Sequence, residues 1–385
     1  AVGFALSSYI TGVERRYITR DQAVERVLLT LKFFWNAPQG PGEKSTGHKG
    51  FFYHFLDMKT GLRFEKVELS TIDTALLLSG ILSCQVYFDR PAEAENEIRA
   101  LADAIYRRAD WAWFTPRFPL VSMGWHPESG FLPHDWRGYN EGMILYILAL
   151  GSPTHQLAKE SWDEWTRTYS WGKFHGHENV QFSPLFGHQY SHIWIDFKGI
   201  VDDYMEQKGI DYFENSRRAV HSNRRYCIEN PKGWKGYGET TWGLTACDGP
   251  GGGPPFHAYW ARGASLLEIA DDGTIAPTAA GGSIPFAPEI CIPALKAMHQ
   301  KYGSKIYGKY GFLDAFNPSY PGGDGQGWFD KDYLGIDNGP IVLMIENHYS
   351  GLIWTLMKKN EYIVNGLKKA GFRKGWLNMQ EREKR

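Results

Sequence analysis

Cysteine is scarce in this chain, and neither charge is in excess. The 385 residues include four cysteines and no CxxC pair, so a cysteine-rich zinc site is not expected. Three of the four lie in apolar stretches and are predicted to be buried thiols. Lysine and arginine number 42 against 43 aspartates and glutamates, which gives a net charge of −1. Because nucleic acids and acidic membranes are bound by clustered positive charge, neither is an expected partner.

Long apolar runs are missing as well. The longest, around Ala75–Leu82 and Met143–Leu150, fall far short of the roughly 20 residues that a membrane span needs. No basic-then-apolar signal peptide opens the chain. Residue 1 already lies inside an apolar helical pattern, and we therefore expect natural N-terminal sequence to precede it. The sequence predicts no membrane span.

Motifs of several common enzyme classes are also missing. DGPGGGPP (Asp248–Pro255) lacks the GK[ST] of a phosphate loop, and no GxSxG elbow occurs. His188 and His192 share a helical face but lack the glutamate of HExxH. His175 and His177 could add ligands, yet aromatic-rich loops more often use histidine for hydrogen bonds. We therefore predict no metal and no cofactor.

Hydrophobic spacing is helical along nearly the whole chain. It predicts twelve helices, at residues 2–15, 19–35, 71–87, 91–108, 139–150, 153–169, 190–206, 211–229, 256–270, 288–302, 338–350 and 357–371. Helices that are apolar on every side alternate with helices that carry one apolar stripe, as inner and outer helices do. Long connections alternate with short ones, which would gather the long ones at one end. The pattern predicts an all-α fold, an (α/α)6 barrel of alternating inner and outer helices, as a single catalytic domain over residues 1–385.

Aromatic residues and glycine are abundant. The chain has 15 Trp, 21 Tyr, 22 Phe and 43 Gly. Eight tryptophans fall in the long connections: Trp111, Trp113, Trp125, Trp136, Trp171, Trp234, Trp242 and Trp328. Aromatic faces stack well on the apolar faces of sugar rings, and large pockets are lined by aromatic side chains. The pattern favours an aromatic-lined cleft, with the alternative that these tryptophans cap the end of the barrel.

Acidic residues recur near the starts of the predicted inner helices. They are Glu68, Asp73, Glu141, Asp196, Asp330, Asp332 and Asp337. In a closed ring they would converge, and two carboxylates across a funnel are what glycoside hydrolysis requires. Each one taken singly could instead cap a helix, as Ser70-x-x-Asp73 indicates. Glu141 precedes a wholly apolar helix, where burial would raise its pKa toward that of a usable acid.

A family resemblance rests on eight strings: ELSTIDTALL, GYNEGMILYILALGSPTH, PLFGHQYSHIWIDF, DYFENSRRA, YGETTWGLTACDGP, DGTIAPTAAGGSIPFAPE, YGFLDAFN and GIDNGP. With them the chain resembles, over residues 2–372, the glucoamylase-like family of glycoside hydrolases that holds bacterial endo-β-1,2-glucanases. The resemblance implies an (α/α)6 barrel that hydrolyses β-1,2-glucan or its oligosaccharides with anomeric inversion. It places the general acid on Glu141 and the base in the loop before the eleventh helix, where we choose Asp337 over Asp332 and Asp330. It also implies export by a Gram-negative bacterium, to the periplasm or outside the cell.

The expected partner is a neutral glucan or oligosaccharide. The predicted substrate-binding residues are Glu68, Asp73, Trp125, Trp136, Tyr139, Asn140, His188, Gln189, Glu239, Trp242, Asp248 and Trp328. One alternative is an exo-acting enzyme that releases a disaccharide, or an α-glucan hydrolase. Another is a non-catalytic carbohydrate-binding protein, which would keep the tryptophans yet tolerate loss of Glu141.

Overall fold

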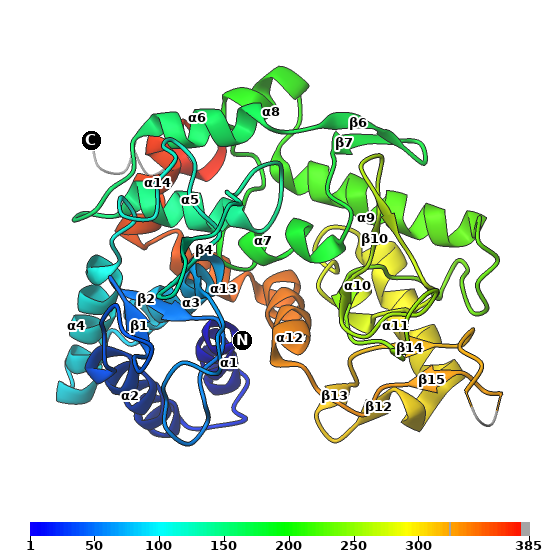
Figure 1. The fold of residues 1–385 in the computed structure, drawn as a ribbon, viewed down its shortest axis with the longest axis horizontal. Helices are drawn as coiled ribbons and strands as arrows, with labels where there is room; N and C mark the ends of the chain where they lie inside the picture. The colour runs from blue at the N-terminus through cyan, green and yellow to red at the C-terminus, as the bar shows by residue number, and fades with distance from the viewer. Residues whose placement is uncertain (323–324, 379–385) are drawn as a thin grey trace.

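Helices form most of the regular structure. A computed structural model describes residues 1–322 and 325–378 (Figure 1). The α-helices are α1 (Val2–Glu14), α2 (Arg20–Asn36), α3 (Thr71–Tyr87), α4 (Glu93–Arg108), α5 (Gly142–Gly151), α6 (Lys159–Arg167), α7 (Tyr190–Trp194), α8 (Asp203–Lys208), α9 (Tyr212–Glu229), α10 (Pro277–Gly281), α11 (Pro288–Tyr302), α12 (Gly335–Ser350), α13 (Leu352–Met357) and α14 (Glu361–Lys369). The 3₁₀ turns are η1 (Leu185–His188) and η2 (Gly303–Lys305). The helix-rich fold that the hydrophobic spacing predicts is confirmed.

Most helices lie where the spacing predicts them, but the one expected at 190–206 is broken into α7 and α8. α7 ends at Trp194, because Ile195 is already extended, and Gly199, between the two helices, has a φ of +76°, a conformation that favours glycine. The Asp202 carboxylate then caps α8 by accepting a hydrogen bond from the Met205 N–H (2.9 Å). A local backbone requirement therefore interrupts an apolar pattern that reads as continuous.

The helix predicted at 256–270 is wrong. This segment holds strands β9 (Trp260–Ala261), β10 (Gly263–Ala264) and β11 (Ile269–Ala270), and the helix in this part of the chain is α10. The reason is Arg262, whose buried guanidinium donates to Asp272 Oδ1 (2.7 Å) and to the carbonyl oxygen of Cys247 (2.7 Å). Wrapping a chain around a buried cation is a tertiary constraint that helical spacing does not reveal.

The helices that are apolar on every side are buried among the others. α1 packs against α3 and α12, α3 against α4 and α5, and α5 against α7 and α14. α12 also contacts α7 and α10, and α10 packs against α11. Glycine permits a close approach of α1 to α3, since a Cβ on Gly80 of α3 would lie 2.2 Å from the Gly3 carbonyl oxygen of α1.

Short strands occupy the long connections. An antiparallel five-stranded sheet follows chain order: β1 (Gly47–His48), β2 (Phe51–Tyr53), β3 (Leu69–Ser70), β4 (Gly124–His126) and β5 (Gly130–Phe131). The two-stranded sheets are β6 (Trp171–Phe174) with β7 (His177–Val180), β8 (Ala246–Cys247) with β9, β10 with β11, β12 (Tyr307–Gly308) with β13 (Gly311–Phe312), and β14 (Phe316–Asn317) with β15 (Trp328–Phe329). The five-stranded sheet joins the first two long connections next to the start of α3.

The four cysteines are buried free thiols, which confirms that prediction for those in apolar stretches. Within residues 1–322 and 325–378, every helix is too short or too polar to cross a membrane.

Candidate active site

Glu141 stands directly before α5, with its carboxyl group free for chemistry. The residue is partly exposed, while its Oε2 atom is buried and accepts no hydrogen bond. Burial, with a smaller contribution from the negative charge of Asp73, raises the pKa of Glu141 to about 7. A carboxylic acid that keeps its proton near neutral pH is suited to general acid catalysis.

The local sequence explains why the Glu141 carboxyl does not cap its helix. Asn140 takes that role, because its Oδ1 accepts a hydrogen bond from the Gly142 N–H (2.9 Å) and its Nδ2 donates to the Arg137 carbonyl oxygen (2.9 Å). A Cβ on Gly142 would lie 2.8 Å from that Oδ1 and 3.2 Å from the Trp136 ring. Asn140, which we predict to bind substrate, thus shapes the turn that presents Glu141.

Asp337, the predicted base, lies buried in the first turn of α12, and Asp314 is the charged residue that acts on it most strongly. Burial and the neighbouring Asp314 raise the pKa of Asp337 well above its ordinary value. Asp314 is a residue that the sequence reasoning missed. It follows β13, and its Oδ2 accepts a hydrogen bond from the Asp248 backbone N–H (2.7 Å). The negative charges of Asp337 and, less strongly, of Glu141 both act on the buried Tyr190 and help to raise its pKa, although its burial contributes most.

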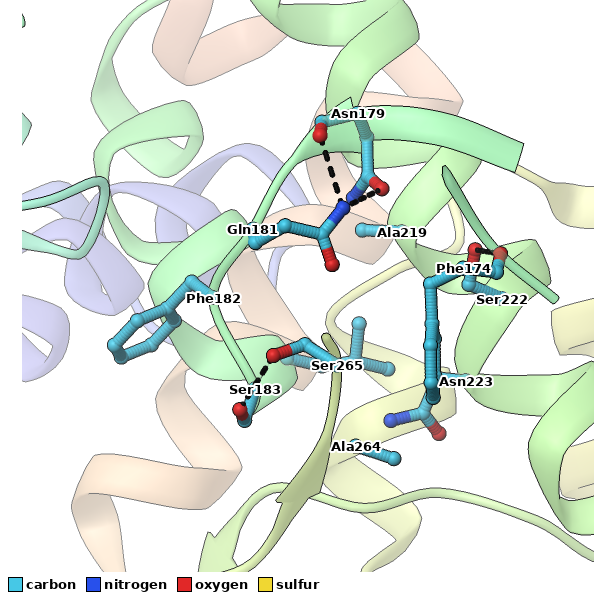
Figure 2. A pocket seen from close by; sticks show the side chains of 11 residues that line it. Phe174, Asn179, Gln181, Phe182, Ser183, Ala219, Ser222, Asn223, Ala264 and Ser265 are labelled. Carbon is cyan, nitrogen blue, oxygen red and sulfur yellow. Dashed lines mark hydrogen bonds between the residues drawn. The ribbon is translucent and has the colours of Figure 1, made fainter. Parts of the chain in front are cut away.

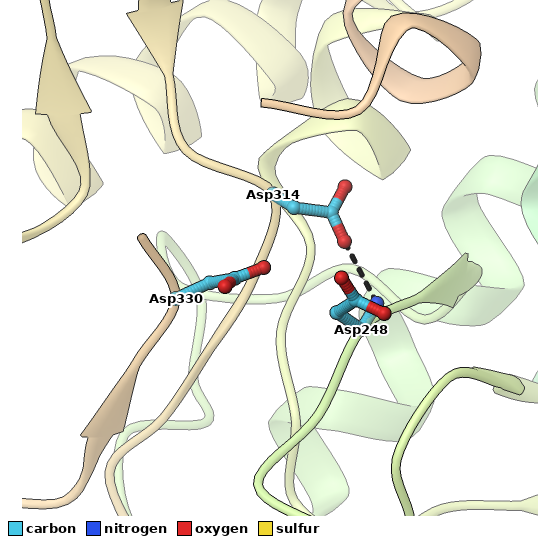
Figure 3. Close-up of side chains that lie close together, drawn as sticks. All are labelled: Asp248, Asp314 and Asp330. Carbon is cyan, nitrogen blue, oxygen red and sulfur yellow. Dashed lines mark hydrogen bonds between the residues drawn. The ribbon is translucent and has the colours of Figure 1, made fainter. Parts of the chain in front are cut away.

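Asp314 also belongs to a cluster of three carboxylates (Figure 3). Asp248, Asp314 and Asp330 each bring an oxygen to within 4.8 Å of the others. Asp330 Oδ1 accepts hydrogen bonds from the backbone N–H groups of Lys331 (2.7 Å) and Asp332 (3.3 Å). Burial raises the pKa of Asp248, of Asp330 and, to about 6, of Asp314. Three such oxygens could also hold a cation.

His54 joins two of the predicted substrate-binding residues. The imidazole Nδ1 lies 2.8 Å from Glu68 Oε1, and the Nε2 lies 3.5 Å from Asp73 Oδ2. Burial opposes protonation of His54, but the two carboxylates outweigh it and raise its pKa. Ser70 caps α3 as predicted, since its Oγ accepts from the Asp73 N–H (3.2 Å). Asp196, in contrast, follows α7 and pairs with Lys358 (2.6 Å), so it lies outside the site.

The predicted aromatic residues divide into two groups. Trp125 and Trp328 are half-buried in β4 and β15 and present part of their rings to solvent. Trp136 and Trp242 are buried, and Trp136 Nε1 donates to Thr71 Oγ1 (2.9 Å). The prediction that Trp136 and Trp242 contact sugar is therefore wrong in this structure. They fill the end of the core, the alternative that composition left open.

The predicted polar contacts need a similar correction. Gln189 is fully buried, and its Nε2 donates to the Ala279 carbonyl oxygen (3.0 Å) and to Ser283 Oγ (2.8 Å), so it ties η1 to α10 and does not face a ligand. Tyr139 and His188 are buried with their ring centroids 4.8 Å apart. Glu239 is exposed on a turn between Gly238 and Thr241.

The histidines do not assemble into a metal site. His192 Nε2 lies 3.1 Å from Ser216 Oγ, His175 pairs with Glu229 (2.9 Å), and burial lowers the pKa of His188 to about 4. Over residues 1–322 and 325–378, the one group of acidic, thiol or imidazole side chains close enough for a metal is the aspartate cluster described above.

A small polar cavity lies apart from the acidic residues, between β7, α9 and β10 (Figure 2). Its volume of about 10 Å³ corresponds to a single water molecule. Gln181, Asn223 and the hydrogen-bonded pair Ser183 and Ser265 (2.8 Å) line it. The cavity is too small for a sugar ring.

Comparisons with known proteins agree on one family. The family model described as "Putative glucoamylase" matches residues 133–361. An exo β-1,2-glucooligosaccharide sophorohydrolase (non-reducing end) from Parabacteroides distasonis is 30% identical over 96% of this chain. The chain spans about half of that relative's length, 52%.

Solved structures extend the similarity to nearly the whole chain. A putative glucoamylase from Bacteroides uniformis has a TM-score of 0.85 and 34% identity, with 98% of this chain and 88% of that chain covered. An endo-β-1,2-glucanase from Chitinophaga pinensis, in complex with sophorotriose and glucose, has a TM-score of 0.84 and 31% identity, with 96% and 86% covered.

Proposed function

The chain belongs to the glucoamylase-like family, and from that premise we propose that it is a glycoside hydrolase that cleaves β-1,2-linked glucan or its oligosaccharides. The observation that carries the proposal is Glu141, a partly exposed carboxyl group with an unpaired oxygen and a pKa of about 7. The cluster of Asp248, Asp314 and Asp330 supports it as a source of further carboxylates. The names of relatives support the linkage, since both an exo-acting and an endo-acting member act on β-1,2-glucans.

The mechanism we propose is direct displacement with inversion. Glu141 donates its proton to the glycosidic oxygen while a water molecule attacks the anomeric carbon from the opposite face. Asp337 removes the proton of that water. Glu68, Asp73 and His54 provide acceptors and donors for sugar hydroxyl groups. No charged group is needed on the substrate, which fits a neutral glucan.

We also propose that α1, α3, α5, α7, α10 and α12 form the inner ring of a single (α/α)6 domain. The packing of α1 on α3, α3 on α5, α5 on α7 and α12 on α1, α7 and α10 supports this arrangement. The hydrogen bonds from Gln189 to α10 link that helix to the segment that opens α7. Export to the periplasm or out of a Gram-negative cell remains a prediction from the family resemblance.

Turnover of β-1,2-glucan by wild type and Glu141→Gln tests the function. Loss of the proton donor should lower kcat by about 100-fold or more while thermal unfolding shows a folded protein. Glu93→Gln, on the first turn of the outer helix α4, is the matched control and should keep wild-type turnover. Full turnover by Glu141→Gln, or starch as the preferred substrate, would refute the proposal.

Product sizing separates the two modes of action. An endo-acting enzyme releases a range of oligosaccharides at early times, whereas an exo-acting enzyme releases one disaccharide throughout. The stereochemistry is read by NMR in the first minutes of reaction, where inversion of a β-linkage gives the α-anomer first. Binding of glucan without any turnover would favour the non-catalytic alternative.

A further inference from the structure

We propose that Arg262 is a positioning residue that fixes the loop over residues 248–261 beside the aspartate cluster, and that this loop forms part of the sugar-binding site. The inference deepens the proposed hydrolase function and rests on it for the nature of the ligand. The hold of Arg262 on the loop rests on hydrogen bonds that need no ligand.

The 248–261 loop brings a carboxylate to the cluster with its first residue. Asp248 has an oxygen within 4.8 Å of oxygens of Asp314 and Asp330 (Figure 3). Its backbone N–H donates to Asp314 Oδ2 (2.7 Å). The loop leaves strand β8 and returns through strand β9, which pair with each other. Any shift of this loop therefore moves Asp248 within the cluster.

The tip of the loop does not hold its own position. Gly251, Gly252 and Gly253 have φ values of +71°, +94° and +85°, and a Cβ on any of them would meet no described atom within 4 Å. Consecutive glycines have the greatest backbone freedom, and fixing them costs conformational entropy. The position of the loop must therefore be set at its two ends.

Arg262 bonds both of those ends. The side chain is fully buried, and its Nη1 donates to the carbonyl oxygen of Cys247 (2.7 Å), directly before the loop. Its Nη2 donates to the carbonyl oxygens of His257 (3.0 Å) and Ala258 (3.1 Å), near the end of the loop. A guanidinium carries five N–H donors in a rigid plane, so one side chain can hold both ends at once.

Asp272 anchors the guanidinium outside the loop. Its Oδ1 accepts from Arg262 Nε (2.7 Å), and its Oδ2 accepts from Nη2 (2.8 Å). The same Oδ2 accepts the His257 N–H (3.1 Å). The Asp272 backbone is fixed in turn, because its carbonyl oxygen accepts from Asn317 Nδ2 (2.9 Å) of β14. This two-bond ion pair therefore ties the loop to a strand that is not part of it.

Gly249 is fitted to this arrangement. A Cβ on Gly249 would lie 2.1 Å from Arg262 Nη2 and 2.4 Å from the His257 carbonyl oxygen. Any side chain at this position must displace the guanidinium or the end of the loop. Gly249→Ala therefore disturbs the contact while both charges of the ion pair remain, and it stays informative if Arg262→Lys does not fold.

Hydrogen exchange, followed by mass spectrometry without substrate, tests the hold on the loop. The hydrogen-bonded amides of the loop include those of Asp248, Gly251, Phe256 and His257. They should exchange at least about tenfold faster in Gly249→Ala and in Arg262→Lys, because one ammonium cannot bond both ends. Exchange in the core helices α3 and α5 should keep its wild-type rate.

Asp202→Asn is the matched control for the loss of a buried ionic group. Asp202 is buried and caps α8, and it also accepts from Trp162 Nε1 (3.1 Å) and from the Tyr212 hydroxyl (2.9 Å). Its loop amides should exchange at the wild-type rate. Wild-type exchange of the loop in Gly249→Ala would overturn the proposal. So would an equal acceleration over the whole molecule, because Arg262 would then only stabilise the fold.

Binding of β-1,2-linked glucotriose tests the link to the sugar site. Calorimetry uses the Glu141→Gln background, which lacks the proposed proton donor. Adding Gly249→Ala or Arg262→Lys should raise Kd at least about tenfold, because a loosened loop must be ordered on binding. Adding Asp202→Asn should change Kd by less than about twofold. An unchanged Kd in a protein whose loop exchanges faster would overturn the role of the loop in binding.

Kinetics with Glu141 present give the matching readout. On β-1,2-gluco-oligosaccharides, Gly249→Ala and Arg262→Lys should raise KM about tenfold and keep kcat within about threefold of wild type, as expected when binding alone is lost. A fall in kcat at unchanged KM would overturn the proposal. If the wild type shows no turnover while exchange is faster only in the loop, the hydrolase function fails and the hold of Arg262 on the loop stands.

Discussion

Glu141 is held in a state that favours chemistry at the expense of stability. Its capping function has passed to Asn140, and its Oε2 has no donor. The folded protein therefore prefers the neutral carboxyl, whereas the unfolded chain ionises it near its ordinary pKa of 4.5. Active sites commonly keep groups in such unfavourable states, because an acid that is stabilised as a carboxylate cannot donate a proton.

This state makes stability depend on pH with a definite sign. The pKa of Glu141 is higher in the folded protein than in the unfolded chain. The contribution of Glu141 to the free energy of unfolding is therefore fully present below about pH 4.5 and is lost as the pH rises to about 7. The two pKa values differ by about 2.5, which corresponds to about 3 kcal/mol. Glu141→Gln removes this loss, so above pH 7 it should be more stable than wild type by up to about that amount.

Urea unfolding at about pH 5 and about pH 8 measures the effect. Glu93→Gln should follow the wild-type pH dependence. The argument fails if Glu141→Gln is the less stable protein at the higher pH.

The residues that sequence reasoning found and missed differ in what surrounds them. Glu141 is visible because an apolar run follows it directly in the chain. Asp314 becomes meaningful only through Asp337, 23 positions away, and His54 only through Glu68 and Asp73 across strands of a sheet. Amino-acid composition does not distinguish a tryptophan that lines a cleft from one that fills the core, as Trp242 does. Composition and local spacing carry no information on these tertiary contacts.

Elements are predicted well where a local pattern determines them. The buried helices α3 and α5 follow from runs that are apolar on every side, and α2 begins at the capping box of Thr19 and Gln22. The failures are segments whose conformation serves a distant contact. Residues 256–270 surround the buried pair of Arg262 and Asp272, which a helical pattern of apolar residues does not disclose.

The close packing of helix α1 against helix α3 can be tested by substitution of a glycine between them. A Cβ on Gly80 would lie 2.2 Å from the carbonyl oxygen and 2.6 Å from the Cα of Gly3, atoms of a neighbouring backbone. Gly80→Ala should therefore force the two helices apart and cost about 3 kcal/mol or more in unfolding free energy.

Gly12→Ala in α1 is the matched control, because its Cβ would meet only the Ile18 side chain at 3.3 Å. Its unfolding free energy should stay within about 1 kcal/mol of wild type, since alanine favours a helix. Equal stability of the two variants in a urea titration would contradict the close packing of α1 and α3.

At the scale of the whole molecule, a net charge of −1 conceals a local excess of acid. Asp248, Asp314, Asp330 and Asp337 lie together, and the long connections that carry the first three converge beside the start of α12. A cluster of aspartates repels anions, and long-range electrostatic attraction does not act on a neutral substrate. It suits a neutral polymer that is recognised by hydrogen bonds and by half-buried aromatic rings such as Trp125.

This charge distribution leads to a prediction about salt. The binding of a neutral glucan is not steered by charge, so kcat/KM should change by less than about twofold between about 0.05 and 0.5 M NaCl. β-1,2-Glucan carrying succinyl groups is the matched substrate, because its carboxylates are repelled by the aspartates. Its kcat/KM should start lower and rise with salt as the Debye length shrinks below about 10 Å. A fall of tenfold with salt for the neutral glucan would mean that charge guides the substrate, and the site would then be recognising an ionic polymer.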